Sequence, residues 1–323
     1  MNPTISDNPL SLDGVFPPIP TPFNTDGDIN VDRLRDNLDR WNKQPLSGYV
    51  VGGSNGEFVS LTPDERVEVV QEAGVTIPSD RLLIAGSGME STRATIELTL
   101  QMAEVGADAV IVVTPSYYKR FMSAAALENH YRQVADVSPV PIILYSVPAN
   151  TGVDLQLEAV VRLANHPNVA GIKDSGGSVA KIGAMVHETP DGFQVLAGSA
   201  GFLLGALAVG AVGTVAALAN IAGPELVGML TQFRSGNLAL AQEIQKRLIE
   251  VNTAVTIRFG VPGLKAALDM MGYYGGPVRS PLLPLSDEER GTIRWVLEKA
   301  GLILNPPAGS EPAGGLTPNL RES

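Results

Sequence analysis

A lysine stands in a segment that otherwise has the composition of a buried strand. The segment, residues 170–177, reads AGIKDSGG, and its lysine is Lys173. An ammonium group in a dry interior is costly unless it is paired with a carboxylate or gives up its proton. Lys173 therefore either forms an ion pair, most simply with Asp174, or serves a reaction that needs a buried amine.

Hydroxyl and amide side chains follow several other apolar runs, at points where the chain is expected to leave a strand. They are Thr21, Ser54, Asn55, Thr114, Tyr117, Tyr118, Tyr145, Ser175, Ser199 and Asn220. The three histidines, His130, His166 and His187, lie away from these ends, and no cluster of carboxylates and histidines has the spacing of metal ligands. No G-x-x-x-x-G-K-[ST] phosphate loop is present. These residue types offer the chemistry of one amine assisted by hydroxyls, with no metal.

A neutral lysine amine enclosed by apolar side chains can attack a carbonyl carbon and form a Schiff base. The protonated imine then accepts the electrons of a breaking bond, and a nearby tyrosine such as Tyr145 could carry the protons. Two alternatives remain open at this point. Tyr145 also fits a core residue whose hydroxyl makes one hydrogen bond. The segment GGSNGEF, residues 52–58, is either an ordinary tight turn or a cradle whose N–H groups bind a carboxylate.

Eight nearly continuous apolar runs recur along the chain, as expected for parallel strands that are covered on both faces. They are 14–20, 48–54, 82–88, 109–115, 141–148, 169–176, 193–199 and 213–220. Helical patterns lie between most of them. The clearest, 61–74, has Thr62 as N-cap, Pro63 at its first position and Glu65 completing a capping box.

This alternation predicts an α/β protein, a (β/α)₈ TIM barrel over residues 12–224, with its active site at the carboxyl ends of the strands. A doubly wound sheet is the alternative. It needs a glycine-rich fingerprint after the first strand, and the sequence PPIPTPF at that place has none.

The last third of the chain has a different pattern. After residue 224 the strand pattern stops and helical patterns follow. Residues 225–304 are therefore predicted to form a C-terminal helical extension packed on the barrel, with a capping box at Ser286 and Glu289. Residues 305–323 are rich in Pro and Gly, and we expect them to form a disordered tail.

Composition and charge restrict the partners and the location. The formal net charge is −11 and the pI about 4.8, which argues against a nucleic acid or an anionic membrane surface as partner. The chain has no cysteine, so disulfides and thiolate nucleophiles are excluded. Residues 195–224 carry no charge and are long enough to span a bilayer, but glycines interrupt them. We expect two buried strands joined by a buried helix there, and a cytoplasmic protein, because the N-terminus lacks the apolar core of a signal peptide.

Four motifs together resemble a known family. They are GSNGEF at 53–58, TPSYYKR at 114–120, YSVPANTG at 145–152 and GIKDSGG at 171–177. On these motifs nearly the whole chain is similar to the dihydrodipicolinate synthase and N-acetylneuraminate lyase family of class I, pyruvate-handling aldolases.

The resemblance implies a role for five residues. Lys173 is the Schiff-base lysine, and Tyr145 is the proton shuttle. Ser54 and Asn55 hold the carboxylate of the pyruvyl unit, and Tyr118 reaches across a tight dimer interface. The resemblance further implies a homotetramer, built as a dimer of dimers, that acts on small 2-keto acids and aldehydes and needs no cofactor.

Within the family, the chain is most similar to members that cleave 4-hydroxy-2-oxoglutarate to pyruvate and glyoxylate, on the segments YSVPANTG, KDSGG, VLAGSAGF and RFGVPGLK. The dihydrodipicolinate synthases normally carry an arginine just before the Thr-Gly pair of the first segment, where this chain has Asn150. We therefore expect a reversible aldolase for that substrate, with Ser175 and Asn150 at its distal end. The alternatives are a dihydrodipicolinate synthase, a 2-keto-3-deoxy sugar-acid aldolase or dehydratase, and a keto-acid binding protein without catalysis.

Overall fold

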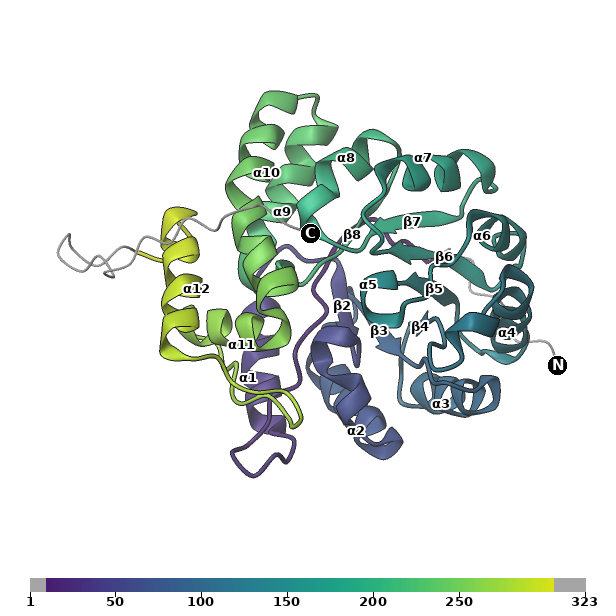
Figure 1. Ribbon diagram of the computed structural model, residues 1–323, viewed down its shortest axis with the longest axis horizontal. Coiled ribbons are helices and arrows are strands. Elements are labelled where there is room, and N and C mark those ends of the chain that lie inside the picture. Colours follow the sequence, from purple (N-terminus) through teal and green to yellow (C-terminus); the bar gives the residue numbers. More distant parts are fainter. Residues whose placement is uncertain (1–9, 305–323) are drawn as a thin grey trace.

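Eight parallel strands form a barrel in the computed structural model, which describes residues 10–304 (Figure 1). The strands are β1 (Gly14–Phe16), β2 (Gly48–Val51), β3 (Leu82–Gly86), β4 (Ala109–Val113), β5 (Ile142–Ser146), β6 (Val169–Asp174), β7 (Gln194–Ala197) and β8 (Gly213–Val215). Their order is β1-β8-β7-β6-β5-β4-β3-β2. Beyond β1, Ile19 N–H donates to the Val50 carbonyl and Val50 N–H to the Pro17 carbonyl, both at 3.0 Å, which joins β2 to the first strand segment. The predicted TIM barrel is confirmed.

Helices follow the strands and cover the outside of the barrel. They are α1 (Val31–Trp41), α2 (Pro63–Thr76), α3 (Thr92–Glu104), α4 (Ala124–Val137), the short α5 (Pro148–Thr151), α6 (Leu157–Leu163), α7 (Val179–Glu188) and α8 (Leu203–Ala208). The predicted capping box of Thr62 and Glu65 starts α2 with Pro63 at its first position. Ser91, Ser123 and Ser178 are the N-caps of α3, α4 and α7, where each side-chain hydroxyl accepts a backbone N–H.

Four further helices follow the last strand. They are α9 (Ala219–Arg234), α10 (Leu238–Thr253), α11 (Gly260–Met270) and α12 (Asp287–Lys299), with a π-helical turn, Ala254–Arg258, between α10 and α11. Figure 1 shows α10, α11 and α12 gathered on the side of the barrel opposite α4 and α6. The predicted capping box of Ser286 and Glu289 starts α12. Helix α9 runs through residue 224, with a break at Ala222, so the division at 224 stays a prediction. Residues 305–323, the expected tail, lie outside the described residues.

The uncharged segment 195–224 folds as two strands joined by a helix. Strands β7 and β8 flank α8, as expected, and the chain then turns into α9. The apolar run 213–220 is longer than β8 because its second half forms this turn and the start of α9. Within residues 10–304, no helix is both long enough and apolar enough to cross a membrane.

Apolar side chains fill the barrel on both sides of its strands. The interior is packed with Phe16, Val50, Ile84, Ile111, Ile143, Leu196 and Val215, and a second cluster lies between the strands and the helices. Close strand contacts need glycine at some positions. A Cβ on Gly171 of β6 would lie 2.1 Å from the Gln194 carbonyl oxygen of β7. The continuous apolar runs of the sequence are therefore explained by burial on both faces.

His130 on α4 is buried, and this makes the stability of the fold depend on pH. Its Nδ1 lies 2.9 Å from the Thr92 hydroxyl, while no partner within the described residues reaches its Nε2. Burial lowers the pKa of His130 from 6.5 to about 4. Between these two pH values the unfolded chain binds a proton that the folded chain does not, so acid favours unfolding.

We predict that the free energy of unfolding falls by about 3 kcal/mol as the pH drops from about 6.5 to about 4, because of His130. His130→Gln should remove this part of the pH dependence. Urea unfolding of both proteins at the two pH values measures it. His187→Gln, at an exposed position on α7, is the control, and its free energy of unfolding should change with pH as that of the wild type does. If the free energy of unfolding of His130→Gln changes with pH as much as that of the wild type, other groups cause the pH dependence.

Candidate active site

Lys173 and Tyr145 face each other at the carboxyl ends of two neighbouring strands. Tyr145 on β5 and Lys173 on β6 are register partners in the parallel pairing. Lys173 Nζ is 3.9 Å from the centroid of the Tyr145 ring, and the two residues are only 4% and 6% exposed. The barrel thus holds an amine against an aromatic face, at the end where this fold places its active sites.

The carboxylate next to Lys173 in the sequence is paired with another cation. Asp174 is fully buried, and its Oδ2 is 3.1 Å from Nζ of Lys181 on α7. Successive residues of a strand point to opposite faces, so Asp174 faces the helices while Lys173 faces the barrel interior. Among residues 10–304, no carboxylate forms an ion pair with Lys173 within 4.0 Å. The geometry therefore favours the chemical interpretation of Lys173 over the ion pair.

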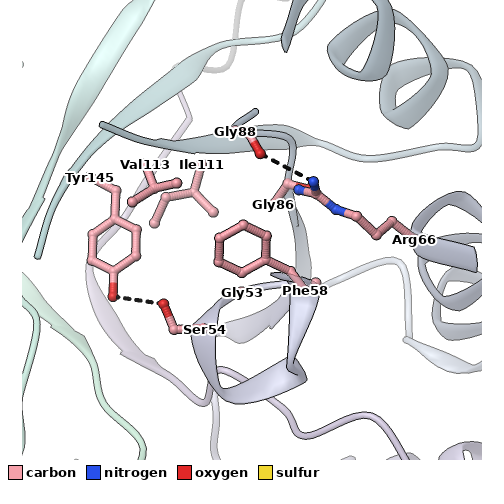
Figure 2. A pocket seen from close by; sticks show the side chains of 10 residues that line it. Gly53, Ser54, Phe58, Arg66, Gly86, Gly88, Ile111, Val113 and Tyr145 are labelled. Atoms are coloured by element: carbon pink, nitrogen blue, oxygen red, sulfur yellow. Dashed lines mark hydrogen bonds between the residues drawn. The ribbon is translucent and has the colours of Figure 1, made fainter. Parts of the chain in front are cut away.

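The Tyr145 hydroxyl points to Ser54, the first residue of the 3₁₀ turn Ser54–Gly56 that follows β2 (Figure 2). The two hydroxyl oxygens are 3.4 Å apart. Burial raises the pKa of Tyr145, but the charge of Lys173 and the hydrogen bonds of neighbouring side chains, among them Ser54, outweigh burial. The pKa of Tyr145 therefore lies below its ordinary value of 10.0. A tyrosine that gives up its proton more easily is suited to general acid–base catalysis.

The turn that carries Ser54 and Asn55 leaves two N–H groups available. Inside the turn, Gly56 N–H donates to the Gly53 carbonyl at 2.9 Å and Glu57 N–H to the Ser54 carbonyl at 3.2 Å. The N–H groups of Ser54 and Asn55 come at the start of the turn, where a helical segment supplies no internal acceptor. Both residues are half-buried. The available N–H groups favour the interpretation that this turn binds a carboxylate over the interpretation that it is an ordinary tight turn.

The C-terminal extension holds this turn in place through Glu57. Glu57 has a φ of 56° and is the one non-glycine residue in the left-handed region among residues 10–304, which costs about 1 kcal/mol or more. Its buried carboxylate lies 2.6 Å from Nζ of Lys265 on α11 and accepts the N–H of Arg279 at 2.8 Å. Since an unpaired buried charge is strongly unfavourable, these contacts fix the turn beside Tyr145.

A small cavity lies between the turn and β3 and β4 (Figure 2). Its lining comprises Gly52, Gly53, Ser54, Phe58, Arg66, Gly86, Gly88, Ile111, Val113 and Tyr145. Arg66 on α2 is 2% exposed and donates to the Gly86 carbonyl at 2.7 Å and the Gly88 carbonyl at 3.1 Å. Burial lowers the pKa of Arg66 to about 10, so its guanidinium remains charged at neutral pH and adds positive charge behind the turn.

The other predicted site residues lie in less enclosed positions. Ser175 is half-buried, and its hydroxyl is 3.4 Å from the Gly198 carbonyl. Asn150 is exposed on α5, and Tyr118 is 67% exposed before the 3₁₀ turn Lys119–Phe121. The structure thus brings Lys173, Tyr145 and Ser54 together, and the catalytic and binding roles of all the predicted site residues stay predictions.

Three strand-end residues that the sequence offered as candidates make structural bonds instead. The Thr21 hydroxyl donates to the Gly56 carbonyl at 2.7 Å, and Asn220 donates to the Pro18 carbonyl at 3.0 Å. Ser199 bonds to Asn252 of α10 at 3.1 Å. Within residues 10–304, no three His, Asp or Glu side chains are grouped as metal ligands.

Sequence reasoning missed the charged residues that support the site. Arg66, Lys181 and Lys265 each lie on a helix, where a basic residue ordinarily faces water. Their partners are distant in the sequence, so no local pattern marks them. The left-handed backbone of Glu57 was not predicted either, because nothing in the sequence GGSNGEF indicates a positive φ at this residue.

We predict that Tyr145→Phe lowers kcat by about 10²–10⁴-fold, because it keeps the ring against Lys173 and removes only the hydroxyl to which the family resemblance assigns proton transfer. Its melting temperature should stay close to that of the wild type. Steady-state kinetics and thermal unfolding of both proteins check this. A kcat within a few-fold of wild type would mean that Tyr145 only fills the core.

Comparison with known proteins agrees with this geometry. Residues 11–300 match the dihydrodipicolinate synthetase family. A 4-hydroxy-tetrahydrodipicolinate synthase of Methanothrix thermoacetophila is 40% identical over 287 residues, covering 88% of this chain and 96% of that protein. A DapA-like lyase of Halobacterium salinarum, itself uncharacterized, is 38% identical over 302 residues, covering 92% of this chain and 97% of that protein.

Solved structures show the same architecture. The dihydrodipicolinate synthase DapA-2 of Bacillus anthracis superposes with a TM-score of 0.87 at 33% identity, covering 90% of this chain and 98% of its own. The chloride-inhibited dihydrodipicolinate synthase of Acinetobacter baumannii, complexed with pyruvate, gives a TM-score of 0.87 at 31% identity, covering 91% of this chain and 100% of its own. The barrel, the enclosed lysine and these similarities place the chain in the dihydrodipicolinate synthetase family, among the class I pyruvate aldolases.

Proposed function

We propose that the chain is a Schiff-base lyase that cleaves 4-hydroxy-2-oxoglutarate reversibly to pyruvate and glyoxylate. The observation that carries the Schiff-base chemistry is the enclosed Lys173, whose Nζ lies 3.9 Å from the Tyr145 ring centroid with no carboxylate partner among the described residues. An amine in this setting is poised to attack a 2-keto group.

The proposed reaction proceeds in steps, in which Lys173 forms the imine and Tyr145 transfers protons. Lys173 attacks the 2-keto carbon, water leaves, and a protonated imine forms. Tyr145 takes the proton of the 4-hydroxyl while the bond between C3 and C4 breaks, and the imine accepts the electron pair as an enamine. Glyoxylate leaves, C3 of the enamine takes up a proton, and hydrolysis of the imine releases pyruvate and the free amine.

Binding of the pyruvyl carboxylate is assigned to the turn after β2. The N–H groups of Ser54 and Asn55 and the Ser54 hydroxyl are donors beside Tyr145. Arg66 behind the turn adds a buried positive charge on the same side. Donors that are fixed before the substrate arrives lose little conformational freedom on binding. This preorganisation favours binding of the substrate carboxylate.

Asn150 supports glyoxylate as the aldehyde partner. In the family pattern, dihydrodipicolinate synthases normally carry an arginine at this position, which the resemblance implies helps to bind the semialdehyde substrate. Asn150 is exposed on α5 and offers a neutral amide without a two-pronged charged donor. Glyoxylate carries its carboxylate on the reacting carbon, within reach of short donors such as Ser175, so it does not need a long cationic arm.

The second candidate is a 4-hydroxy-tetrahydrodipicolinate synthase. The names of the relatives support this reaction better than the aldolase reaction, since several proteins at 34–40% identity bear that name. It uses the same imine of pyruvate and differs only in the aldehyde. A 2-keto-3-deoxy sugar-acid aldolase or dehydratase would share the imine as well, whereas a keto-acid binding protein would bind without turnover.

A homotetramer built from tight dimers belongs to the same proposal. Tyr117 and Tyr118 are 78% and 67% exposed, and their rings meet edge to face at 5.1 Å. Two such aromatic rings on a loop beside the barrel mouth are suited to a contact with a second subunit. In this arrangement Tyr118 of one subunit approaches Tyr145 of the other.

We predict that kcat/KM for cleavage of 4-hydroxy-2-oxoglutarate is at least about tenfold higher than that for condensing pyruvate with aspartate semialdehyde. A lost charge-assisted hydrogen bond is worth about 1.5–3 kcal/mol, which corresponds to this factor or more. Both values should be measured on one preparation at one pH, and lysine should not inhibit.

Asn150→Arg tests the reason for this preference. It should raise kcat/KM for aspartate semialdehyde relative to kcat/KM for 4-hydroxy-2-oxoglutarate. Asn165→Arg, a matched change at an exposed position on the barrel exterior, should leave the ratio of the two kcat/KM values unchanged. If aspartate semialdehyde proves the better substrate of the unmodified protein, the synthase candidate replaces the aldolase and the Schiff-base assignment remains.

A further inference from the structure

We infer that Lys181 is a positioning residue, which touches no substrate but sets the alignment of Lys173 and Tyr145. Lys181 lies in the first turn of α7, on the outer side of the barrel wall. Its Nζ is 2.5 Å from Oδ1 of Asp154 and 3.1 Å from Oδ2 of Asp174. One ammonium therefore joins two carboxylates that come from different segments of the chain.

Each of these carboxylates is tied to a strand that carries a reacting group. Asp174 directly follows Lys173 in β6. Asp154 Oδ1 accepts the Ser146 hydroxyl at 2.9 Å, and Ser146 directly follows Tyr145 in β5. The chain of contacts therefore runs from Ser146 through Asp154 and Lys181 to Asp174.

The strand register places this chain of contacts behind the reacting groups. Tyr145 lies opposite Lys173 in the pairing of β5 with β6, and Ser146 lies opposite Asp174. Side chains alternate between the two faces of a strand. Lys173 and Tyr145 thus point into the barrel, while Ser146 and Asp174 point to the helices, where Asp154 and Lys181 together connect them.

Burial makes this connection rigid. The side chain of Asp174 is 0% exposed and that of Lys181 is 17% exposed. A carboxylate that is fully buried must keep its cation, because breaking the pair leaves an uncompensated charge. The other oxygen of Asp174 accepts the N–H of Gly176 at 2.9 Å, so the same carboxylate also shapes the loop that carries Ser175.

Alignment of the imine and the proton carrier governs the rate. A displacement of about 1 Å at a reacting centre can reduce the rate by about 100-fold. Loss of the Lys181 bridge leaves the ends of β5 and β6 joined by their backbone pairing alone, and small displacements of Lys173 relative to Tyr145 then become easier. The expected result is slower proton transfer on an imine that still forms, because the Lys173 amine itself remains enclosed.

The test uses pyruvate alone and rests on the proposed imine chemistry. In D₂O, the enzyme-bound imine of pyruvate loses a C3 proton to a base and takes up a deuteron, so NMR of the pyruvate methyl group reports exchange without any aldehyde. Borohydride trapping measures how much imine is present. If the wild type neither traps nor exchanges pyruvate, the proposed function fails, whichever aldehyde is the partner.

Lys181→Met keeps the apolar stem of the side chain and removes its charge. We expect exchange per trapped imine to slow by about 10- to 100-fold, with trapping by pyruvate within about threefold of wild type at saturating concentration. Lys181→Arg, which retains a cation at this place, should recover most of the rate. Lys299→Met is the matched control, because Lys299 pairs with Glu250 at 2.6 Å on the exposed side of the extension, and it should exchange like the wild type.

Asp154→Asn is a second variant for the case that Lys181→Met does not fold. The Asp154 side chain is 50% exposed, so its substitution leaves no buried charge without a partner, yet it weakens the same connection to Ser146. Its exchange rate should also fall while trapping persists. The inference is overturned if a folded Lys181→Met or Asp154→Asn exchanges the pyruvate protons at the wild-type rate. It is also overturned if imine trapping and proton exchange fall by the same factor.

Discussion

An amine enclosed in a barrel, with no carboxylate ion-paired to it among residues 10–304, is the constraint on which this structure depends. The proposed Schiff-base chemistry requires that no carboxylate holds Lys173 as a permanent ammonium partner. Asp174 is paired with Lys181 on the helix side, and Glu57 is paired with Lys265 of the extension. Lys173 lies against the ring of Tyr145 instead. In the proposed reaction these ion pairs therefore do more than stabilise the fold, because they occupy carboxylates that could otherwise pair with Lys173.

The extension is linked to the chemistry through the same kind of contact. Lys265 and Arg279 reach Glu57, whose left-handed backbone shapes the turn of Ser54 and Asn55. Asn252 of α10 bonds to Ser199 at the end of β7. Helices that lie beside the barrel in Figure 1 therefore fix two of the loops at its mouth. This explains in physical terms why the polar residues of α10 and α11 that face the barrel are buried although they do not react.

Much of the fold could be read from the sequence, because it depends on local patterns. Continuous apolar runs gave all eight strands, and the two capping boxes gave the starts of α2 and α12. The end of β8 could not be predicted, since the turn after Val215 is as apolar as the strand itself. In the site, Lys173 was visible as a charge in a strand. The absence of an ion pair between Lys173 and Asp174 could not be predicted. It depends on Lys181, which lies on the following helix and is brought to Asp174 only by the fold.

The central claim is that Lys173 forms a covalent imine with a 2-keto acid, and reductive trapping with pyruvate tests it most directly. The unmodified protein is treated with pyruvate and sodium borohydride, digested, and analysed by peptide mass spectrometry, with Lys173→Ala as the control. The account predicts one reduced pyruvyl group, located on the peptide that contains Lys173 and absent from the control. An adduct on a different lysine, or no adduct at saturating pyruvate, would contradict it.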